Sequence, residues 1–262
     1  MSNPATVGSL VDDLRRLGVE TGDVLMVHSS MSALGFVVGG PQAVCEALLS
    51  AVGTSGTIAM PSQSSDWSEP SGWSDPPVPE HWWPTIRERW PAYDPYTTPL
   101  RGMGAIASAF LQRRSTVRSA HPRLSVMASG RRAHTIVNHH ALEEGFGEGS
   151  PLARLYDLDA KVLLLGATHE ANTSLHLAEC RATWPGKRTI EQGSAVMTER
   201  GREWVTYVET EAQSGDFGAV GSAFAATGLE RVGQVASATV RVMPQRALVD
   251  FAATWFAANR HG

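Results

Sequence analysis

The run Val162-Leu163-Leu164-Leu165 constrains the fold of this chain more than any other segment. Four consecutive aliphatic residues with no polar alternation indicate a strand that is buried on both faces. Strands of that kind occur in sheets that helices cover on both sides. We therefore place residues 161–166 in the central sheet of an α/β fold.

The first 60 residues show an order of elements that supports this fold class. Apolar residues at helical spacing predict helices over 7–17 and 43–52. Short apolar runs predict strands over 24–27 and 57–60. Helix, strand, polar loop, helix and strand in succession are typical of parallel α/β architecture. We expect a central mixed, largely parallel sheet flanked by helices.

The rest of the chain adds further helices, some strands and one long irregular segment. Residues 62–100 hold five of the eight tryptophans and eight prolines, which predicts a packed loop lining a cleft. We expect helices over 104–113, 133–139, 174–180, 221–227 and 248–259, and strands over 124–128 and 234–242. A smaller antiparallel part is expected within 189–208. With no internal repeat, residues 1–262 are expected to form a single domain.

Charge and composition narrow the class of partner. The net charge of -4 argues against nucleic acid, because phosphate binding needs a basic surface. It is compatible with a cationic small molecule, or with solubility alone. Cys45 and Cys180 are far apart and predict no disulfide framework or zinc knuckle. Since neither a secretory signal nor a membrane span is evident, we expect a cytoplasmic protein without a membrane partner.

The polar segment after the first predicted strand is a candidate phosphate-binding loop. Small and hydroxyl-bearing residues before a helix let backbone N–H groups approach an anion. The alternative is an ordinary strand-to-helix connection, because the Walker A pattern is missing. The candidate cofactor-binding residues here are His28, Ser29, Ser30, Ser32, Leu34, Gly35 and Gly39.

A second candidate for phosphate contact is Arg118, which precedes the turn His121-Pro122. A basic residue beside a constrained Xaa-Pro turn can bind a phosphate. A salt-bridged surface arginine is the alternative.

The segment from Leu165 to Glu179 is the richest in chemistry-bearing side chains. His169 follows the buried strand, at the edge where α/β proteins place ligands. A helix starting near Asn172 would put His176 and Glu179 on one face. A histidine with a carboxylate nearby suits a general base. Convergence of His169, His176 and Glu179 on a metal is the alternative, although the spacing is not H-E-x-x-H.

Scattered carboxylates complete the set of candidates. Asp66, Glu148, Asp216 and Glu209 could surround a polycationic amine, with tryptophans offering flat surfaces to sugar rings. Each carboxylate could equally be a solvated surface group. A serine nucleophile is less well supported, because no G-x-S-x-G elbow is present.

Taken together, these segments resemble the aminoglycoside 3-N-acetyltransferase family. They occur in the family's order and cover about residues 7–225. The matching pieces are VHSSMSALG at 27–35, GT at 56–57 with MP at 60–61, WWP at 82–84, YDP at 93–95, TPLRGMG at 98–104, RSAHP at 118–122, GEGSPL at 147–152, the stretch 169–179, and DF at 216–217.

The resemblance implies an α/β fold that is not the GNAT fold. It also implies acetyl-CoA as donor, without a metal, and the 3-amine of a 2-deoxystreptamine ring as acceptor, which is a route to antibiotic resistance. Residues 29–40 would contact the pantetheine and pyrophosphate of CoA, and Arg118 its phosphates. Asp66, Glu148, His176 and Asp216 are the expected substrate-binding residues.

In the mechanism that follows from this resemblance, His169 is the catalytic base and Glu179 supports it. The base deprotonates the amine, which attacks the thioester in a ternary complex. The Thr173 hydroxyl or a backbone N–H would stabilise the oxyanion. Alternatives are acetylation of another small amine, a metal-dependent hydrolase or amidase, and a non-catalytic CoA- or sugar-binding module. The expected assembly is a monomer or a homodimer.

Overall fold

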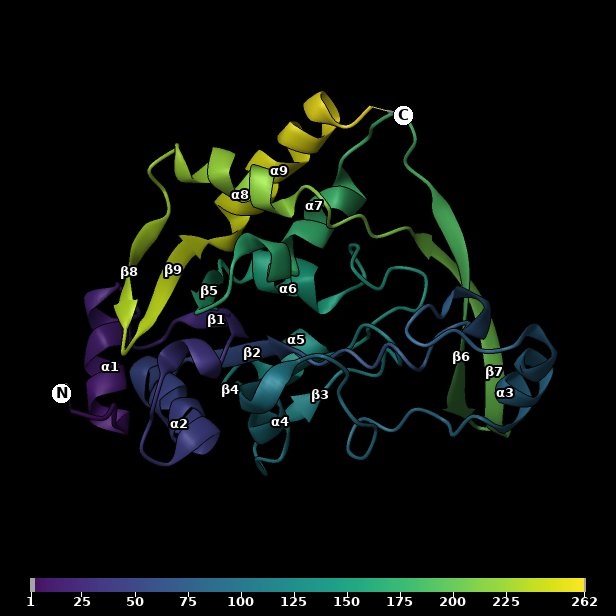
Figure 1. Cartoon of the computed structure of the whole chain (residues 1–262), viewed down its shortest axis with the longest axis horizontal. Helices are drawn as coiled ribbons and strands as arrows, with labels where there is room; N and C mark the ends of the chain where they lie inside the picture. The colour runs from purple at the N-terminus through teal and green to yellow at the C-terminus, as the bar shows by residue number, and fades with distance from the viewer. Residues whose placement is uncertain (1–2, 262) are drawn as a thin grey trace.

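A seven-stranded mixed sheet forms the centre of the computed structural model, which describes residues 3–261 (Figure 1). Its strand order is β3-β4-β2-β1-β5-β9-β8. A separate two-stranded sheet pairs β6 with β7. The strands are β1 (Val24–Ser29), β2 (Thr57–Pro61), β3 (Val117–Arg118), β4 (Val126–Gly130), β5 (Lys161–Leu165), β6 (Thr189–Thr198), β7 (Gly201–Thr210), β8 (Arg231–Val235) and β9 (Ala238–Pro244).

Among the described strands of the seven-stranded sheet, parallel pairing is confined to the three central ones. β1 runs parallel to β2 on one side and to β5 on the other, with His28 opposite Leu164. The pairs β2·β4, β3·β4, β5·β9 and β8·β9 are antiparallel. The α/β class and the mixed central sheet are thus confirmed, but the parallel part is smaller than the sequence led us to expect.

Helices cover both faces of the sheet, and each face has its own apolar core. Alternate residues of β5 serve the two cores: Leu163 and Leu165 belong to one, Val162 and Leu164 to the other. This confirms the predicted burial of β5 on both faces. The first core includes α1 (Val7–Arg16), α2 (Gly40–Val52) and α4 (Gly104–Leu111); the second includes α5 (Ala133–Val137), α6 (Pro151–Asp157), α7 (Ser174–Arg181), α8 (Phe217–Ala225) and α9 (Gln245–Asn259).

The tryptophan-rich segment packs against the β6–β7 sheet, at the right of Figure 1. The amide of Tyr93 donates to Ala195 O at 2.8 Å, and the hydroxyl of Ser194 donates to Trp67 O at 2.6 Å. Trp67 and Trp90 meet edge to face, with ring centroids 5.8 Å apart. The segment contains α3 (Trp83–Arg89) and short 3-10 turns, η2 (Pro70–Gly72) and η3 (Glu80–Trp82), and is otherwise irregular, as predicted.

Some predicted elements differ from those observed. The strand expected over 234–242 is a hairpin, because the chain turns back at Ala236, whose φ is 50°, and Ser237. The helix expected over 221–227 is α8, which begins at Phe217. The helix α6 and the short strand β3 were not anticipated.

Within residues 3–261 there is no helix of the length and apolar character that a membrane crossing requires.

Replacing Leu164 by alanine tests the two-sided burial of β5. Leu164 is fully buried, so the truncation leaves a cavity and should lower the free energy of unfolding by about 2–5 kcal/mol. The control is Leu229→Ala, at a side chain that is 49% exposed, which should change it by about 0.5 kcal/mol or less. Chemical denaturation measures both, and equal losses would contradict the assignment.

Candidate active site

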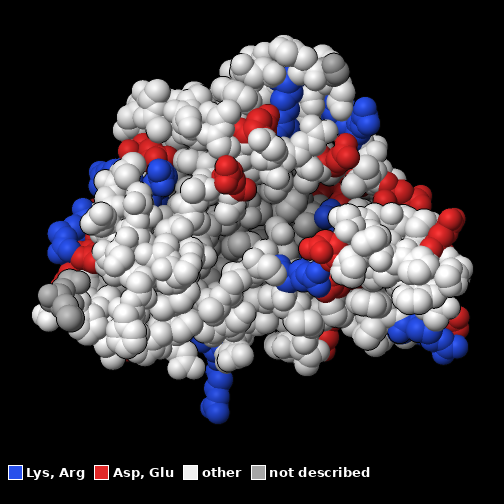
Figure 2. All heavy atoms as spheres, viewed as in Figure 1, with Lys and Arg blue, Asp and Glu red and all other residues white. Residues whose placement is uncertain are grey.

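A cavity of about 250 Å³ lies where β1 and β2 end and where α7 begins. The carboxyl ends of parallel strands are where open α/β sheets bind ligands. Figure 2 shows a hollow near the middle of the face in view, with both acidic and basic side chains at its rim. The cavity is lined by Val27, His28, Ser29, Met60, Pro61, Gln63, Gly102, Met103, Ala107, Ala167, Glu170, Ala171, Asn172, Thr173, His176, Ser214 and Phe217.

The imidazole of His176 enters this cavity from α7. Its Nδ1 donates a hydrogen bond to the carboxylate of Glu179, one helical turn further on, so Nε2 is the ring nitrogen left for a ligand. Phe146 stacks on the imidazole with centroids 4.3 Å apart, and Phe217 flanks it at 4.8 Å. The ring is therefore fixed in both position and orientation.

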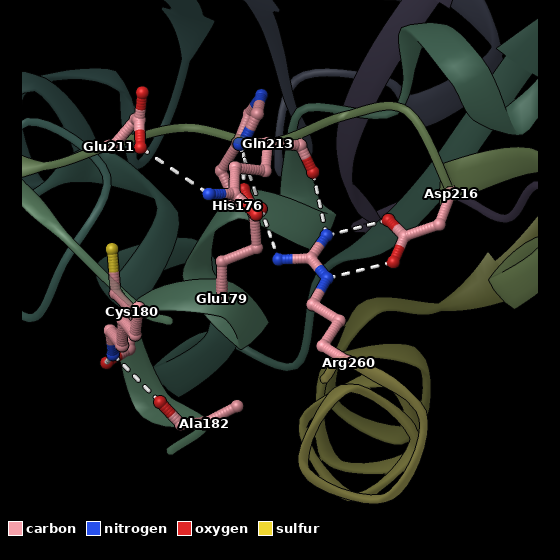
Figure 3. Close-up of polar contacts among 9 residues, drawn as sticks. His176, Glu179, Cys180, Ala182, Glu211, Gln213, Asp216 and Arg260 are labelled. Carbon is pink, nitrogen blue, oxygen red and sulfur yellow. Dashed lines mark hydrogen bonds and ion pairs between the residues drawn. The ribbon is translucent and has the colours of Figure 1, made fainter. Parts of the chain in front are cut away.

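The partner of His176 is itself held by several donors (Figure 3). Glu179 Oε1 accepts from the backbone amide of Gln213 at 3.0 Å and from Arg260 Nη1 at 2.6 Å. Arg260 also grips Asp216 through two nitrogens, at 2.6 and 2.8 Å. Such donors stabilise a carboxylate that is removed from water.

His28 and Thr173 complete the polar lining near His176. His28 ends up on the same sheet face as α7, because it lies two residues after Met26, which packs in that core. Burial, with smaller contributions from His176 and His169, lowers the pKa of His28 to about 3. This ring is therefore neutral at physiological pH. Thr173 is buried at the start of α7 and also lines the cavity.

His169 does not occupy the position predicted for it. Its side chain is 8% exposed, and the ring is not among the groups lining the cavity. Nε2 of His169 lies 2.7 Å from Glu230 Oε2, and its Nδ1 lies 3.4 Å from the side-chain nitrogen Nδ2 of Asn172. Gly221 of α8 packs so closely that a Cβ there would overlap the ring. The ring of His169 is thus enclosed by Glu230, Asn172 and Gly221 and does not line the cavity.

The donors of Arg118 are also used in hydrogen bonds within the protein. Its guanidinium donates to the carbonyl oxygens of Thr98 and Ser62, each at 2.6 Å. It donates as well to the hydroxyls of Ser125 and Ser64. Three of these acceptors, Ser62, Ser64 and Thr98, belong to the tryptophan-rich segment, which the guanidinium thus ties to the sheet. The contact of Arg118 with CoA phosphates stays a prediction.

The predicted phosphate loop is only partly in the cavity. His28 and Ser29 line it, whereas Ser30, Ser32, Leu34, Gly35 and Gly39 are not among the lining residues. The hydroxyls of Ser30 and Ser32 lie 3.1 Å apart, and Leu34 is buried in the apolar core of the first sheet face.

The predicted substrate carboxylates are dispersed. Asp66 pairs with Arg101 at 3.3 Å and lines another cavity of about 520 Å³ beside Trp73. Glu148 pairs with Arg181 at 2.7 Å at a further cavity. Of the acidic candidates, only Asp216 is connected to His176, and that connection runs through Arg260 and Glu179.

The three side chains considered as metal ligands do not converge. His176 binds Glu179, whereas His169 binds Glu230. Over residues 3–261, no three or more His, Cys, Asp or Glu side chains are grouped as a metal site would require.

Comparison with known proteins identifies the family. Residues 26–257 match the sequence model of the family described as "Aminoglycoside 3-N-acetyltransferase". The chain belongs to the aminoglycoside 3-N-acetyltransferase family. It is 44% identical to the SPbeta prophage-derived aminoglycoside N(3')-acetyltransferase-like protein YokD of Bacillus subtilis, over 98% of this chain and 94% of that one. The crystal structure of YokD superposes with a TM-score of 0.96 at 43% identity, covering 99% of this chain and 96% of that one.

Similar solved structures of this acetyltransferase family include complexes with ligands. One is AAC-IIIb, described as a binary complex with CoASH, with a TM-score of 0.89 and 31% identity over 99% of this chain and 98% of that one. Another is AAC-VIa, described as bound to sisomicin, with a TM-score of 0.89 and 31% identity over 99% and 100%. The fold is thus that of these acyltransferases and not the GNAT fold.

Sequence reasoning missed three residues that shape the site. Arg260 is 81 positions from Glu179, and Glu230 is 61 positions from His169. Phe146 reaches His176 from a loop with no regular pattern. The detectable signal was the spacing of His176 and Glu179 on one helix.

The pH dependence of stability tests the burial of His28. Its pKa is about 3 when folded and 6.5 when exposed, so the unfolded chain binds the proton more tightly. The contribution of His28 to stability is therefore lost as the pH falls from about 6.5 toward 3. Between pH 7 and pH 5, the free energy of unfolding of His28→Asn should fall by about 2 kcal/mol less than that of the parent protein. Urea titrations at the two pH values measure this difference.

The exposed His81 supplies the control, since His81→Asn should leave the difference between the two pH values unchanged. An equal loss in His28→Asn and in the parent protein would show that His28 is not buried as the structure has it.

Proposed function

We propose that this protein transfers the acetyl group of acetyl-CoA to the 3-amine of the 2-deoxystreptamine ring of aminoglycosides, with His176 as general base. The observation that carries the proposal is the imidazole of His176, which lines the cavity and is tied through Nδ1 to the buried carboxylate of Glu179. The sequence led us to assign this role to His169, whose ring faces Glu230 instead.

The hydrogen bond to Glu179 prepares His176 to accept a proton. An aminoglycoside amine is largely protonated at neutral pH and must lose that proton before it attacks. With Nδ1 donating to the carboxylate, Nε2 carries the free lone pair that a base requires. Glu179 also stabilises the imidazolium that forms, as the carboxylate of a catalytic triad does.

Neighbouring groups suit the other partner of the reaction. Acetyl-CoA supplies the activated acyl group. Thr173 presents a hydroxyl in the cavity, and the neutral His28 ring adds an N–H donor, which are the groups that stabilise a developing oxyanion. A neutral His28 also avoids repelling the imidazolium on His176. Because no covalent enzyme intermediate is needed, we infer a ternary complex of both substrates.

The relatives and the surface support the choice of substrates. AAC-IIIb is described with CoASH and AAC-VIa with sisomicin, and both share this fold over nearly the whole chain. Glu170 lines the cavity, and a carboxylate there suits an acceptor that carries several positive charges. We further propose that residues 1–262 act as one domain in the cytoplasm, where acetyl-CoA is found, with a role in antibiotic resistance; residues 1, 2 and 262 lie outside the described part.

Replacing His176 by alanine should remove the base while leaving the CoA site in place. We expect kcat to fall about 10²–10⁴-fold, the usual contribution of a general base, with little change in KM for acetyl-CoA. Release of CoA thiol in the presence of an aminoglycoside measures both constants.

His81→Ala, at an exposed histidine, is the matched control and should retain full activity. An aminoglycoside whose 3-amine is blocked should release no thiol with the parent protein. Normal turnover by His176→Ala, or undiminished thiol release with the blocked acceptor, would refute the proposal.

A further inference from the structure

Arg260 is the residue that closes the polar network behind His176. It immediately follows α9 and lies three positions beyond the segment 26–257 that matches the family. Its side chain is 8% exposed, which is low for an arginine. Figure 3 shows its guanidinium between Glu179 and Asp216, with Gln213 above it.

The donors of this guanidinium are directed at four oxygen atoms on three residues. Nη1 donates to Glu179 Oε1 and Nη2 to Gln213 O, each at 2.6 Å. Nε and Nη2 donate to the two carboxylate oxygens of Asp216. The planar group also stacks on Phe256, 3.8 Å from the ring centroid. A fork held on two carboxylates and an aromatic face has little freedom to reorient.

The fixed guanidinium of Arg260 determines how the carboxylate of Glu179 is oriented. Its Oε1 receives both Arg260 and the backbone amide of Gln213, which leaves Oε2 for Nδ1 of His176. If Arg260 were absent, Oε1 would lose its charged donor and the carboxylate could rotate away from the imidazole. The direction in which His176 presents Nε2 thus depends on a residue that does not line the cavity.

We propose that Arg260 is a positioning residue for the reaction, acting through Glu179 to orient His176; this rests on the proposed role of His176 as base. Arg260 joins the end of α9 to Glu179 on α7 and to Asp216, which immediately precedes α8. Phe217, the first residue of α8, packs on the imidazole of His176. The same guanidinium therefore fixes both the hydrogen-bond partner and one flanking ring of the base.

The charges around Glu179 support this role. His176 and Arg260 bind the carboxylate directly, and Lys187 lies near, its ammonium donating to the carbonyls of Cys180 and Ala182. Burial lowers the pKa of Arg260, but its hydrogen bonds to Asp216 and Glu179 outweigh this and raise it, so the guanidinium stays charged. Loss of that charge would leave Glu179 with a weaker counter-charge in a buried place.

Arg260→Met tests the proposal, because it keeps an apolar stem while removing every donor. We expect kcat to fall about 10- to 100-fold, by analogy with the loss of a group that hydrogen-bonds and orients a metal-ligating side chain, with KM for acetyl-CoA little changed. Arg260→Lys, which keeps the charge and one donor for Glu179, should recover part of the loss. The matched control is Arg246→Met: Arg246 also lies on α9, pairs with Asp159 and stacks on Tyr156, and its loss should leave kcat unchanged.

A double-mutant cycle separates positioning from a structural role. If Arg260 acts through Glu179, Arg260→Met should lower kcat much less in a Glu179→Gln background than in the parent protein. The imidazole N–H proton of His176, assigned by its loss in His176→Asn, gives a readout without turnover. Its NMR signal should shift in Arg260→Met and stay in place in Arg246→Met.

The outcomes distinguish this inference from the proposed function. Equal fold-losses of kcat in both backgrounds, or an unchanged His176 proton signal in Arg260→Met, would overturn the positioning role. If instead that signal shifts while His176→Ala and Glu179→Gln keep full activity, Arg260 orients the pair as proposed and the assignment of His176 as base is wrong.

Discussion

The hydrogen bond between His176 and the buried carboxylate of Glu179 is the contact on which the site depends. An imidazole alone can carry its proton on either nitrogen and can turn about its side-chain bonds. The carboxylate holds the proton on Nδ1, and the flanking rings of Phe146 and Phe217 hold the plane. A base fixed in this way requires no reorganisation when the amine arrives, which is how preorganised sites lower barriers.

The sheet explains why this pair faces a cavity. β1 and β5 run parallel side by side, so the segments that follow them leave from the same edge. His28 is the penultimate residue of β1, and the turn that leads into α7 follows β5. The N-terminal end of α7 is therefore brought beside the end of β1, and His176 projects between them. Leu175 of α7 packs in the same apolar core as Leu164 of β5, which holds α7 against the sheet.

Several features of this arrangement could be predicted from the sequence because their signals are local. The run Val162-Leu163-Leu164-Leu165 indicated a doubly buried strand, and the three-residue spacing of His176 and Glu179 put both side chains on one helical face. The order of the motifs identified the family. Each of these signals lies within a few residues or repeats along the chain.

The features that could not be predicted depend on contacts between distant segments. His169 and His176 both follow the buried strand, and nothing local shows which of them faces the cavity. Glu230 and Gly221, from a later part of the chain, enclose the ring of His169, and His176 is the histidine that lines the cavity. Arg118 lies beside an Xaa-Pro turn, as a phosphate ligand can, but its guanidinium donates to the carbonyls of Ser62 and Thr98, which are distant in the sequence.

A structure with a non-reactive acetyl-CoA analogue and an aminoglycoside bound together tests the central claim most directly. The account predicts that the 3-amine lies within about 3.2 Å of His176 Nε2, directly or through one water molecule. An amine placed beside another residue, with Nε2 of His176 turned away from it, would contradict the account.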